Sequence, residues 1–184
     1  MAQTSLITIT NGFVGFADVP AGGADFDLTN VVGFCHQTSS AGITASANTT
    51  STPATFCSPA SERSTSSSFQ LDIEGLQDWG RDDGEQSFSE WLFENDGGQA
   101  MAVLLPVNSN TANVAAVCEV SVAAGDFLGG SGDALSFTGT MPLTGYPDIY
   151  DKDGNILRRG QAGSTTAQWT IVGDVDWTAI GTQV

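Results

Sequence analysis

Residues 87–106, SFSEWLFENDGGQAMAVLLP, contain the one convincing helix pattern of the chain and, directly after it, an apolar strand. Ser87 is positioned to cap the helix, and Glu90 three residues later completes a capping box. The large apolar side chains that share one helix face are Phe88, Trp91 and Leu92. Glycines 97–98 end the helix. The almost wholly apolar stretch 101–107 predicts a strand covered on both faces, with the helix as one cover.

Patterns on both sides of this unit predict more strands. Residues 5–19 form two apolar runs separated by Asn11-Gly12, a strong two-residue hairpin signal, so we expect an opening hairpin or a bulged strand. The other expected strands are 31–35, 68–73, 114–122, 126–128, 135–143 and 168–172. The sequence therefore predicts one mainly β domain over residues 1–184. Its expected form is an antiparallel β-sandwich or barrel with one flanking α-helix.

Two of these strands carry a clear alternation of apolar and polar residues, which is typical of strands with a buried face. The face expected in the core consists of Val114, Ala116, Cys118, Val120 and Val122 in one strand, and of Leu135, Phe137 and Met141 in the other. Glu119 and Ser121 are expected to point away from the core.

Residues 36–68 interrupt the strand pattern. They are rich in Ser, Thr, Ala and Asn, and they offer few large apolar residues beyond Ile43 and Phe56. Such a stretch cannot bury enough apolar area to order itself, so we expect a long Ser/Thr-rich loop that serves as an arm, a partner-binding loop or a linker. An alternative left open is a short edge strand at 42–47.

The charge balance narrows the function classes. Lys and Arg total 5 against 21 Asp and Glu, which gives a formal net charge of -16. A chain this acidic repels phosphate backbones, which argues against a nucleic-acid-binding surface. No apolar run approaches the roughly 18 residues of a membrane span, and the start lacks the basic region of a signal peptide. We therefore expect a soluble protein that is not secreted by that route.

The residues suited to catalysis are few. The chain has one histidine and three cysteines, Cys35, Cys57 and Cys118, without a C-x-x-C spacing. Cys35 and His36 are adjacent, so on a strand they point to opposite faces and cannot share a proton. Cys35 and Cys57 could pair, but buried free thiols are favoured in a reducing cytosol. We expect no enzymatic activity, no catalytic residues, no cofactor and no metal.

The acidic stretch 148–154 resembles a calcium-binding loop, which places Asp oxygens at alternate positions before a glycine. Aligned on Gly154, however, the first ligand position is Ile149 and the twelfth is Gly160. Neither residue can supply a carboxylate. The favoured interpretation is a hairpin turn at 151–155.

Acidic and aromatic side chains around the helix raise a carbohydrate hypothesis. The candidate paired carboxylates of a glycosidase are Glu90, Glu94, Asp96, Asp82 and Asp83. On so acidic a chain, solvated carboxylates are the default interpretation. The candidate sugar platform consists of Trp79, Trp91 and Phe93, although the position of Trp91 on the helix favours core packing.

The order of these features resembles the major tail proteins, or tail tube proteins, of long-tailed bacteriophages and related viruses. Four segments carry the resemblance: SFQLDIEG at 68–75, SEWLFENDGGQ at 89–99, MAVLLP at 101–106 and LSFTGTMPLTGYP at 135–147. In this family a strand leads through a loop into a short aromatic helix and then into a strand that ends near proline. The resemblance covers roughly residues 65–150.

The resemblance implies a structural virion protein whose hexameric rings stack into a hollow tube for genome passage. It implies self-association, tape measure and tail terminator or tip proteins as partners, and transient, non-specific passage of DNA through the lumen. The protein would reside in the virion tail, and in the host cytoplasm during assembly. Residues 36–68 look like the loop that reaches the next ring.

The acidic composition agrees with such a tube, because a negatively charged lumen repels DNA and lets it slide. The alternative from another class is a β-sandwich module that binds carbohydrate or protein through Trp79 and the Ser/Thr-rich loop. Another structural phage protein, such as a head decoration or tail terminator protein, shares the same chemistry. An acidic hydrolase that uses Glu90 with Asp82 or Asp83 is the most distant alternative.

Overall fold

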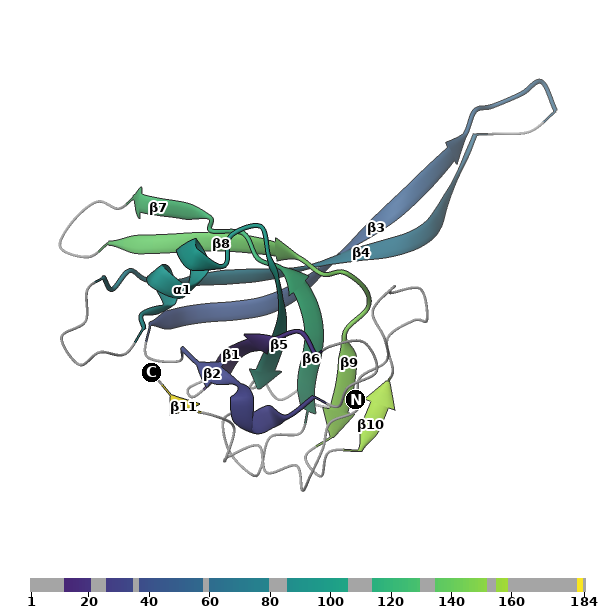
Figure 1. The fold of residues 1–184 in the computed structure, drawn as a ribbon. Helices are drawn as coiled ribbons and strands as arrows, with labels where there is room; N and C mark the ends of the chain where they lie inside the picture. Colours follow the sequence, from purple (N-terminus) through teal and green to yellow (C-terminus); the bar gives the residue numbers. More distant parts are fainter. Residues whose placement is uncertain are drawn as a thin grey trace, which may run out of the picture.

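The computed structural model describes residues 12–20, 26–34, 37–57, 60–79, 86–105, 114–129, 135–151, 155–158 and 182–183. Their strands form two sheets that pack face to face, with one α-helix beside them (Figure 1). Neighbouring strands run antiparallel except for one short parallel pair, β2 with β11. The expected antiparallel β-sandwich with a flanking helix is confirmed.

The larger sheet has seven strands, in the order β10 (Ile156–Arg158), β9 (Asp148–Asp151), β6 (Val114–Ser121), β5 (Gln99–Leu105), β1 (Phe13–Asp18), β2 (Val32–Gly33) and β11 (Thr182–Gln183). The smaller sheet has four, in the order β3 (Thr38–Thr52), β4 (Ser61–Leu76), β8 (Ser136–Pro142) and β7 (Asp126–Gly129). The helices are η1 (Leu28–Asn30), a short 3-10 turn, and α1 (Phe88–Glu94).

The main core lies between the two sheets. The larger sheet contributes Val14, Phe16, Ala102, Leu104, Cys118 and Val120, and the smaller sheet contributes Leu71, Ile73, Phe137 and Met141. The helix adds Phe88 and Leu92, and Phe88 lies 5.1 Å from the ring of Phe137 and 5.5 Å from that of Phe16. These ring contacts tie α1 to both sheets, which makes the helix part of the core.

A second apolar cluster covers the outer face of the larger sheet. It combines Met101, Val103 and Leu105 of β5 with residues around η1, among them Phe26, Leu28 and Val31. The expectation that this strand is covered on both faces is therefore confirmed. Glu119, expected to point to solvent, is buried on this outer face, and its Oε2 has no hydrogen-bond partner among the described residues.

The helix begins as the sequence predicts. The Ser87 hydroxyl accepts a hydrogen bond from the Glu90 amide (3.2 Å), and the Ser87 amide donates to Glu90 Oε2 (3.1 Å). Gly97, with φ of 78°, follows the helix in the left-handed region that favours glycine. No helix in the described part of the chain is long and apolar enough to cross a membrane.

Several predicted strands are confirmed with adjusted ends. Residues 68–73 belong to β4, 114–122 to β6, 126–128 to β7 and 135–143 to β8, while 31–35 shrinks to the two residues of β2. Val114 and Leu135, expected in the core, flank the starts of β6 and β8 and stay exposed, because the sandwich ends there. The second half of the opening hairpin is β1, whereas residues 5–11, 106–107 and 168–172 lie outside the described residues.

The interpretation of residues 36–68 as a loop without regular structure is wrong for most of its length. Thr38–Thr52 and the start of β4 form two paired strands of an antiparallel hairpin. The open alternative of an edge strand at 42–47 is confirmed and extended. Apolar periodicity misses this hairpin because backbone pairing between its strands, and not side-chain burial, organises it.

Glycine is required where β4 passes beneath the Gln37 carbonyl. A Cβ at Gly75 would overlap that oxygen and come within 2.6 Å of the Phe137 ring, whereas a Cβ at Gly42 meets nothing within 4 Å. We expect Gly75→Ala to lower the free energy of unfolding by about 1–3 kcal/mol. The control, Gly42→Ala, should change it by less than about 0.5 kcal/mol. Urea denaturation of both variants checks this, and equal losses would contradict the packing described.

Candidate functional site

The β3–β4 hairpin leaves the body of the protein as a projecting arm (Figure 1). β4 pairs with β3 along almost its whole length, from Thr38 opposite Gly75 to Thr52 opposite Ser61. β8, by contrast, pairs only with residues 70–76 of β4. Residues 46–57 and 60–68, called the arm below, therefore have no third strand beside them. At about 3.3 Å per residue, the β3 residues of the arm, 46–52, extend about 23 Å past the body.

Small polar side chains link the two strands of the arm. Asn48 Nδ2 donates to Ser66 Oγ (3.2 Å), and Thr65 Oγ1 donates to the Asn48 carbonyl (3.0 Å). The register shifts at this point, since Asn48 pairs with Ser66 and Thr49 with Ser64. Thr65 is thus the extra residue of a β-bulge, a feature that bends a ribbon and increases its twist.

The outer edge of β3 is long and carries no charge. It spans 15 residues, TSSAGITASANTTST, without a charged residue or a proline. The other described strands that end a sheet, β7, β10 and β11, have four, three and two residues. Natural proteins protect long edges with charge, proline or bulges because an exposed edge pairs with other chains. The β3–β4 pair has bulges at Ser39 and Thr65, but β3 has neither charge nor proline. The β3 edge is open to such pairing.

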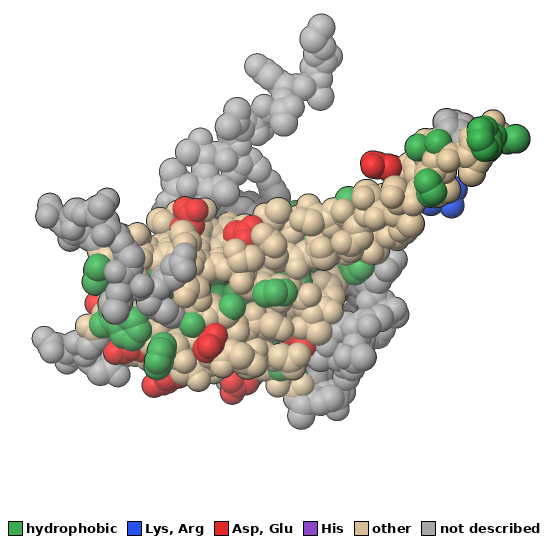
Figure 2. Space-filling model, turned by 90° about the horizontal axis from the view of Figure 1, so that it is seen from above, with side chains coloured by type: hydrophobic (Ala, Val, Ile, Leu, Met, Phe, Trp, Pro, Cys, Tyr) green, Lys and Arg blue, Asp and Glu red, His purple; other side chains and the backbone are tan. Residues whose placement is uncertain are grey.

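The arm is nearly neutral on a strongly acidic chain. Between residues 45 and 69 the only charged residues are Glu62 and Arg63, so the segment has no net charge while the whole chain carries -16. Most of the surface of the arm is neither charged nor hydrophobic (Figure 2). A second acidic copy can therefore approach the arm without strong repulsion.

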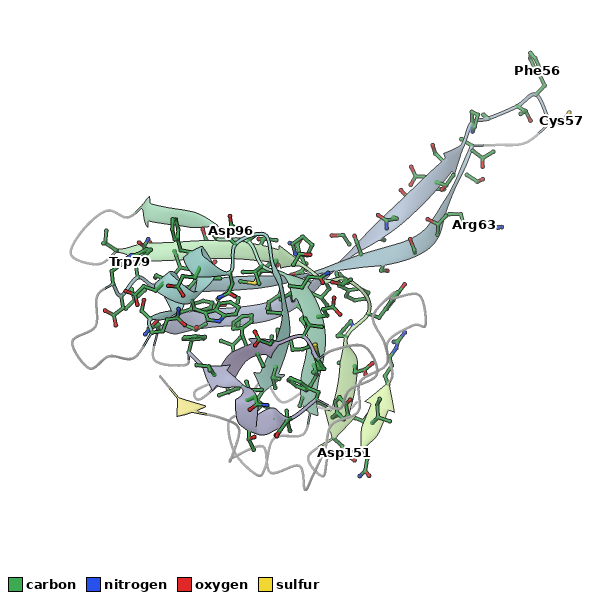
Figure 3. All side chains as sticks on the ribbon, viewed as in Figure 1. Phe56, Cys57, Arg63, Trp79, Asp96 and Asp151 are labelled. Carbon is green, nitrogen blue, oxygen red and sulfur yellow. The ribbon has the colours of Figure 1, made fainter. Side chains whose placement is uncertain are left out.

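The tip of the arm exposes one large apolar side chain and one thiol. Phe56 is fully exposed, and Cys57 beside it is a free, exposed thiol (Figure 3). The favoured prediction of a buried free thiol is therefore wrong for Cys57. At the tip of the arm no apolar core is present to bury its side chain. Cys35 and His36 lie outside the described residues.

Asp72 fixes the root of the arm by joining three strands. Its Oδ2 accepts a hydrogen bond from Thr44 Oγ1 of β3 (2.7 Å) and its Oδ1 accepts one from Thr140 Oγ1 of β8 (2.9 Å). Gln70 Nε2 also donates to Oδ1 (3.0 Å). The bond from Thr44 lowers the pKa of Asp72 most; desolvation partly offsets it, and Thr140 and Gln70 lower it further.

The proposed glycosidase carboxylates have structural partners. Glu90 takes part in the capping box, Glu94 Oε2 accepts from Gln86 Nε2, and Asp96 Oδ1 accepts from the Ala124 amide (2.9 Å). Asp82 and Asp83 lie outside the described residues. The structure thus ties these three acids to α1 and to the turn after β6.

The proposed aromatic platform is divided. Trp91 stacks on Phe16 in the core with ring centroids 4.6 Å apart, as its helix position predicts. Trp79 and Phe93 instead meet edge to face at the protein surface, 6.5 Å apart. Leu135 is also exposed, and its carbonyl accepts from the amide of Gln77 (2.9 Å), two residues before Trp79. We call Trp79, Phe93 and Leu135 the end patch; Trp79 and Phe93 were already grouped in the platform predicted from the sequence, and only Leu135 is new to the group.

The described part of the acidic stretch belongs to a turn, and the buried thiol is protonated. Asp151 Oδ1 accepts from the Asn155 amide (2.8 Å), so the two residues close a turn between β9 and β10, as predicted. Within the described ranges, no three His, Cys, Asp or Glu side chains group to hold a metal. Burial, with a smaller effect of the Asp148 charge, raises the pKa of Cys118 to about 12, so its thiol stays protonated at neutral pH.

Asp72→Asn tests the root of the arm. A lowered pKa means that Asp72 contributes stability above its ordinary value of 3.8, and that this contribution is lost as the pH falls through the lower folded-state pKa. We expect the wild type to be more stable at pH 7 by up to about 1 kcal/mol, because Asp72 is only partly buried and solvent weakens its hydrogen bonds. The difference should vanish in strong acid. Urea denaturation across the pH range measures it, and a pH-independent difference would contradict the assignment.

No protein-family model matches this chain, and no curated protein sequence matches it significantly. The functional conclusion therefore depends on the geometry of the arm, of its open edge and of the end patch.

Proposed function

We propose that this protein is a structural subunit that assembles with copies of itself through the β3–β4 arm. Following the resemblance of its sequence, we propose the tail tube subunit of a long-tailed virus as its specific role. The observation that carries the proposal is the 15-residue, uncharged open edge of β3, whose residues 46–52 lie on an arm outside the body.

The low stability expected of an isolated two-stranded arm supports the proposal that the arm binds another copy. A two-stranded ribbon is marginally stable in water, and burial against a third strand or another surface stabilises it. The arm offers both an open edge of backbone groups and an exposed Phe56. Contact with a second copy satisfies the backbone groups and removes the phenylalanine from water, so association and ordering reinforce each other.

The charge distribution supports the same proposal. Copies that each carry -16 repel one another at long range, and salt screens this repulsion beyond about 8 Å at physiological strength. Close contacts therefore have to come from neutral surfaces, and the arm is such a surface. The remaining acidic surface suits the lining of a channel through which DNA slides without binding.

In this role the subunits form hexameric rings that stack into a tube. The partners are other copies, a tape measure protein inside the tube, and terminator or tip proteins at its ends. DNA passes through the lumen transiently. The protein resides in the virion tail, and in the host cytoplasm during assembly.

A second candidate function is carbohydrate binding, which the exposed Trp79–Phe93 pair favours. Exposed aromatic rings can stack on sugars, but the edge-to-face arrangement of this pair presents no flat double platform. A glycan array probed with wild type and Trp79→Ala separates the two functions. Signals that depend on Trp79 would favour the binding module.

Removal of the arm should abolish assembly and leave the fold intact. We expect the wild-type protein to form rings or hollow tubes in negative-stain electron microscopy as concentration and salt increase. A variant in which Asn-Gly replaces residues 46–68 keeps the paired root of β3 and β4, and should stay monomeric with an unchanged near-ultraviolet circular dichroism spectrum.

Two results would count against the proposal. A monodisperse wild-type monomer or dimer under every condition would remove the evidence for self-assembly. Tubes formed equally well by the shortened variant would show that another surface drives assembly.

A further inference from the structure

We infer that Glu119 and Thr144 belong to a binding site for a divalent cation of the calcium type, on the outer face of the larger sheet. The inference does not depend on the proposed function. It begins from two buried oxygen atoms, Glu119 Oε2 and Thr144 Oγ1, that have no hydrogen-bond partner among the described residues. Buried polar atoms are nearly always satisfied, so two such atoms at one place point to a ligand that is not part of the chain.

The strand ladder places these two residues opposite each other. Val120 forms an antiparallel bridge with Leu143. The Thr144 amide donates to the Glu119 carbonyl (3.0 Å), so these two residues are the next facing pair. Val120 and Leu143 both pack in the main core, which puts the next residue of each chain segment on the outer face. In a facing pair of this kind the Cβ atoms lie about 5 Å apart.

A second acidic residue lies on the same face. Asp148 of β9 pairs with Val117 of β6, two residues from Glu119, and residues two apart on a strand share a face. Glu119 is only 7% exposed and Asp148 only 6%. Burial and then the charge of Asp148 raise the pKa of Cys118, the neighbour of Glu119, so the field of Asp148 reaches this part of β6. Two buried carboxyl groups thus lie in the neighbourhood of the Thr144 hydroxyl.

Buried carboxylates need a compensating positive charge. Burial of an ionised carboxylate is costly unless the group is paired with a cation or coordinates a metal. On the side away from Thr144, Glu119 faces the uncharged Met101 of β5. The cationic side chains in the described ranges are Arg63 on the arm and Arg158 on β10, and both are exposed. A bound cation supplies the charge that these neighbours do not.

The chemistry of the oxygen atoms favours calcium. Ca²⁺ takes about six to eight oxygen ligands in a flexible arrangement, among them carboxylates, carbonyls and waters. The outer face here offers carboxylate and hydroxyl oxygens, whereas zinc and copper favour imidazole and thiolate ligands. Two carboxylates also balance the charge of one divalent ion. Because one ligand is a hydroxyl, the site differs from the groups of three His, Cys, Asp or Glu that the described ranges lack.

Calcium should stabilise the full-length protein. Protein stripped of cations with EDTA is dialysed and then unfolded thermally in calcium chloride or in sodium chloride of equal ionic strength. We expect calcium to raise the unfolding midpoint by about 5 °C or more, relative to sodium chloride, at about a hundredfold excess over its dissociation constant. Equal midpoints in the two salts would overturn the inference, because a protonated carboxyl or a water molecule would then satisfy the two oxygen atoms.

Glu119→Gln removes the buried charge and keeps the shape of the side chain. In calcium this variant should unfold at a lower temperature than the wild type, because it no longer holds the cation. In EDTA it should unfold at the same or a higher temperature, because the wild type then contains an uncompensated buried carboxylate. The matched control is Glu74→Gln on β4, at an exposed glutamate, which should keep the full calcium response. Equal calcium responses of Glu119→Gln and the wild type would overturn the inference.

Terbium luminescence measures binding directly. Terbium(III) binds the oxygen ligands of calcium sites, and a nearby aromatic ring transfers excitation energy to it. Tyr150, buried on the same face two residues beyond Asp148, is the expected donor. Calcium should displace the signal in the wild type, and Glu119→Gln and Thr144→Val should each weaken terbium binding about tenfold or more. Unchanged binding in both variants would overturn the site. Neither measurement requires assembly, so failure of this site leaves the proposed function intact.

Discussion

Backbone hydrogen bonding along β4 is the interaction on which the rest of the structure depends. Its second half pairs with β3 and β8, and there Leu71 and Ile73 enter the core between the sheets. Its first half pairs with β3 alone and forms the arm. One continuous strand thus belongs to both parts, so the packing of the body sets the direction in which the arm leaves. Asp72 strengthens this junction with hydrogen bonds to the strands on either side.

Local signals in the sequence predicted the body of the fold well. Ser87 and Glu90 specify the helix start through a three-residue spacing, and Phe137 and Met141 alternate with polar residues as a half-buried strand requires. These features depend on neighbours in sequence, so a pattern search finds them. The same search found the segment that becomes the arm but not its structure, because its order comes from pairing with residues up to 37 positions away, as in Thr38 with Gly75.

Features that depend on distant segments escaped sequence reasoning. The alternation of apolar and polar residues in β6 predicts that Glu119 points to solvent. It is buried instead, because residues around η1 cover that face of the larger sheet. Sequence reasoning grouped Trp79, Phe93 and Trp91, but it could not show that Trp79 and Phe93 meet at the surface while Trp91 stacks on Phe16, because that division follows from the position of the helix beside both sheets. Such contacts become visible only when the topology is known.

The charged residues and the open strand edge lie in different parts of this chain. The body carries nearly all of the charge, and its sheets end in short strands, apart from β3. The arm carries the outer part of the open β3 edge, residues 46–52, has no net charge and exposes Phe56. In the assembly that we propose, this division would keep the acidic copies dispersed at low concentration and leave the neutral arm for close pairing.

Amide hydrogen exchange of β3 residues 46–52, compared between dilute and assembled protein, tests this account most directly. Alternate amides of an edge strand point away from their partner strand and exchange rapidly in a monomer. If the arm assembles the subunits, exchange at these amides slows by about 100-fold or more on assembly, since a second copy covers them. Equally fast exchange in both states would contradict the account, because assembly would then proceed without the arm.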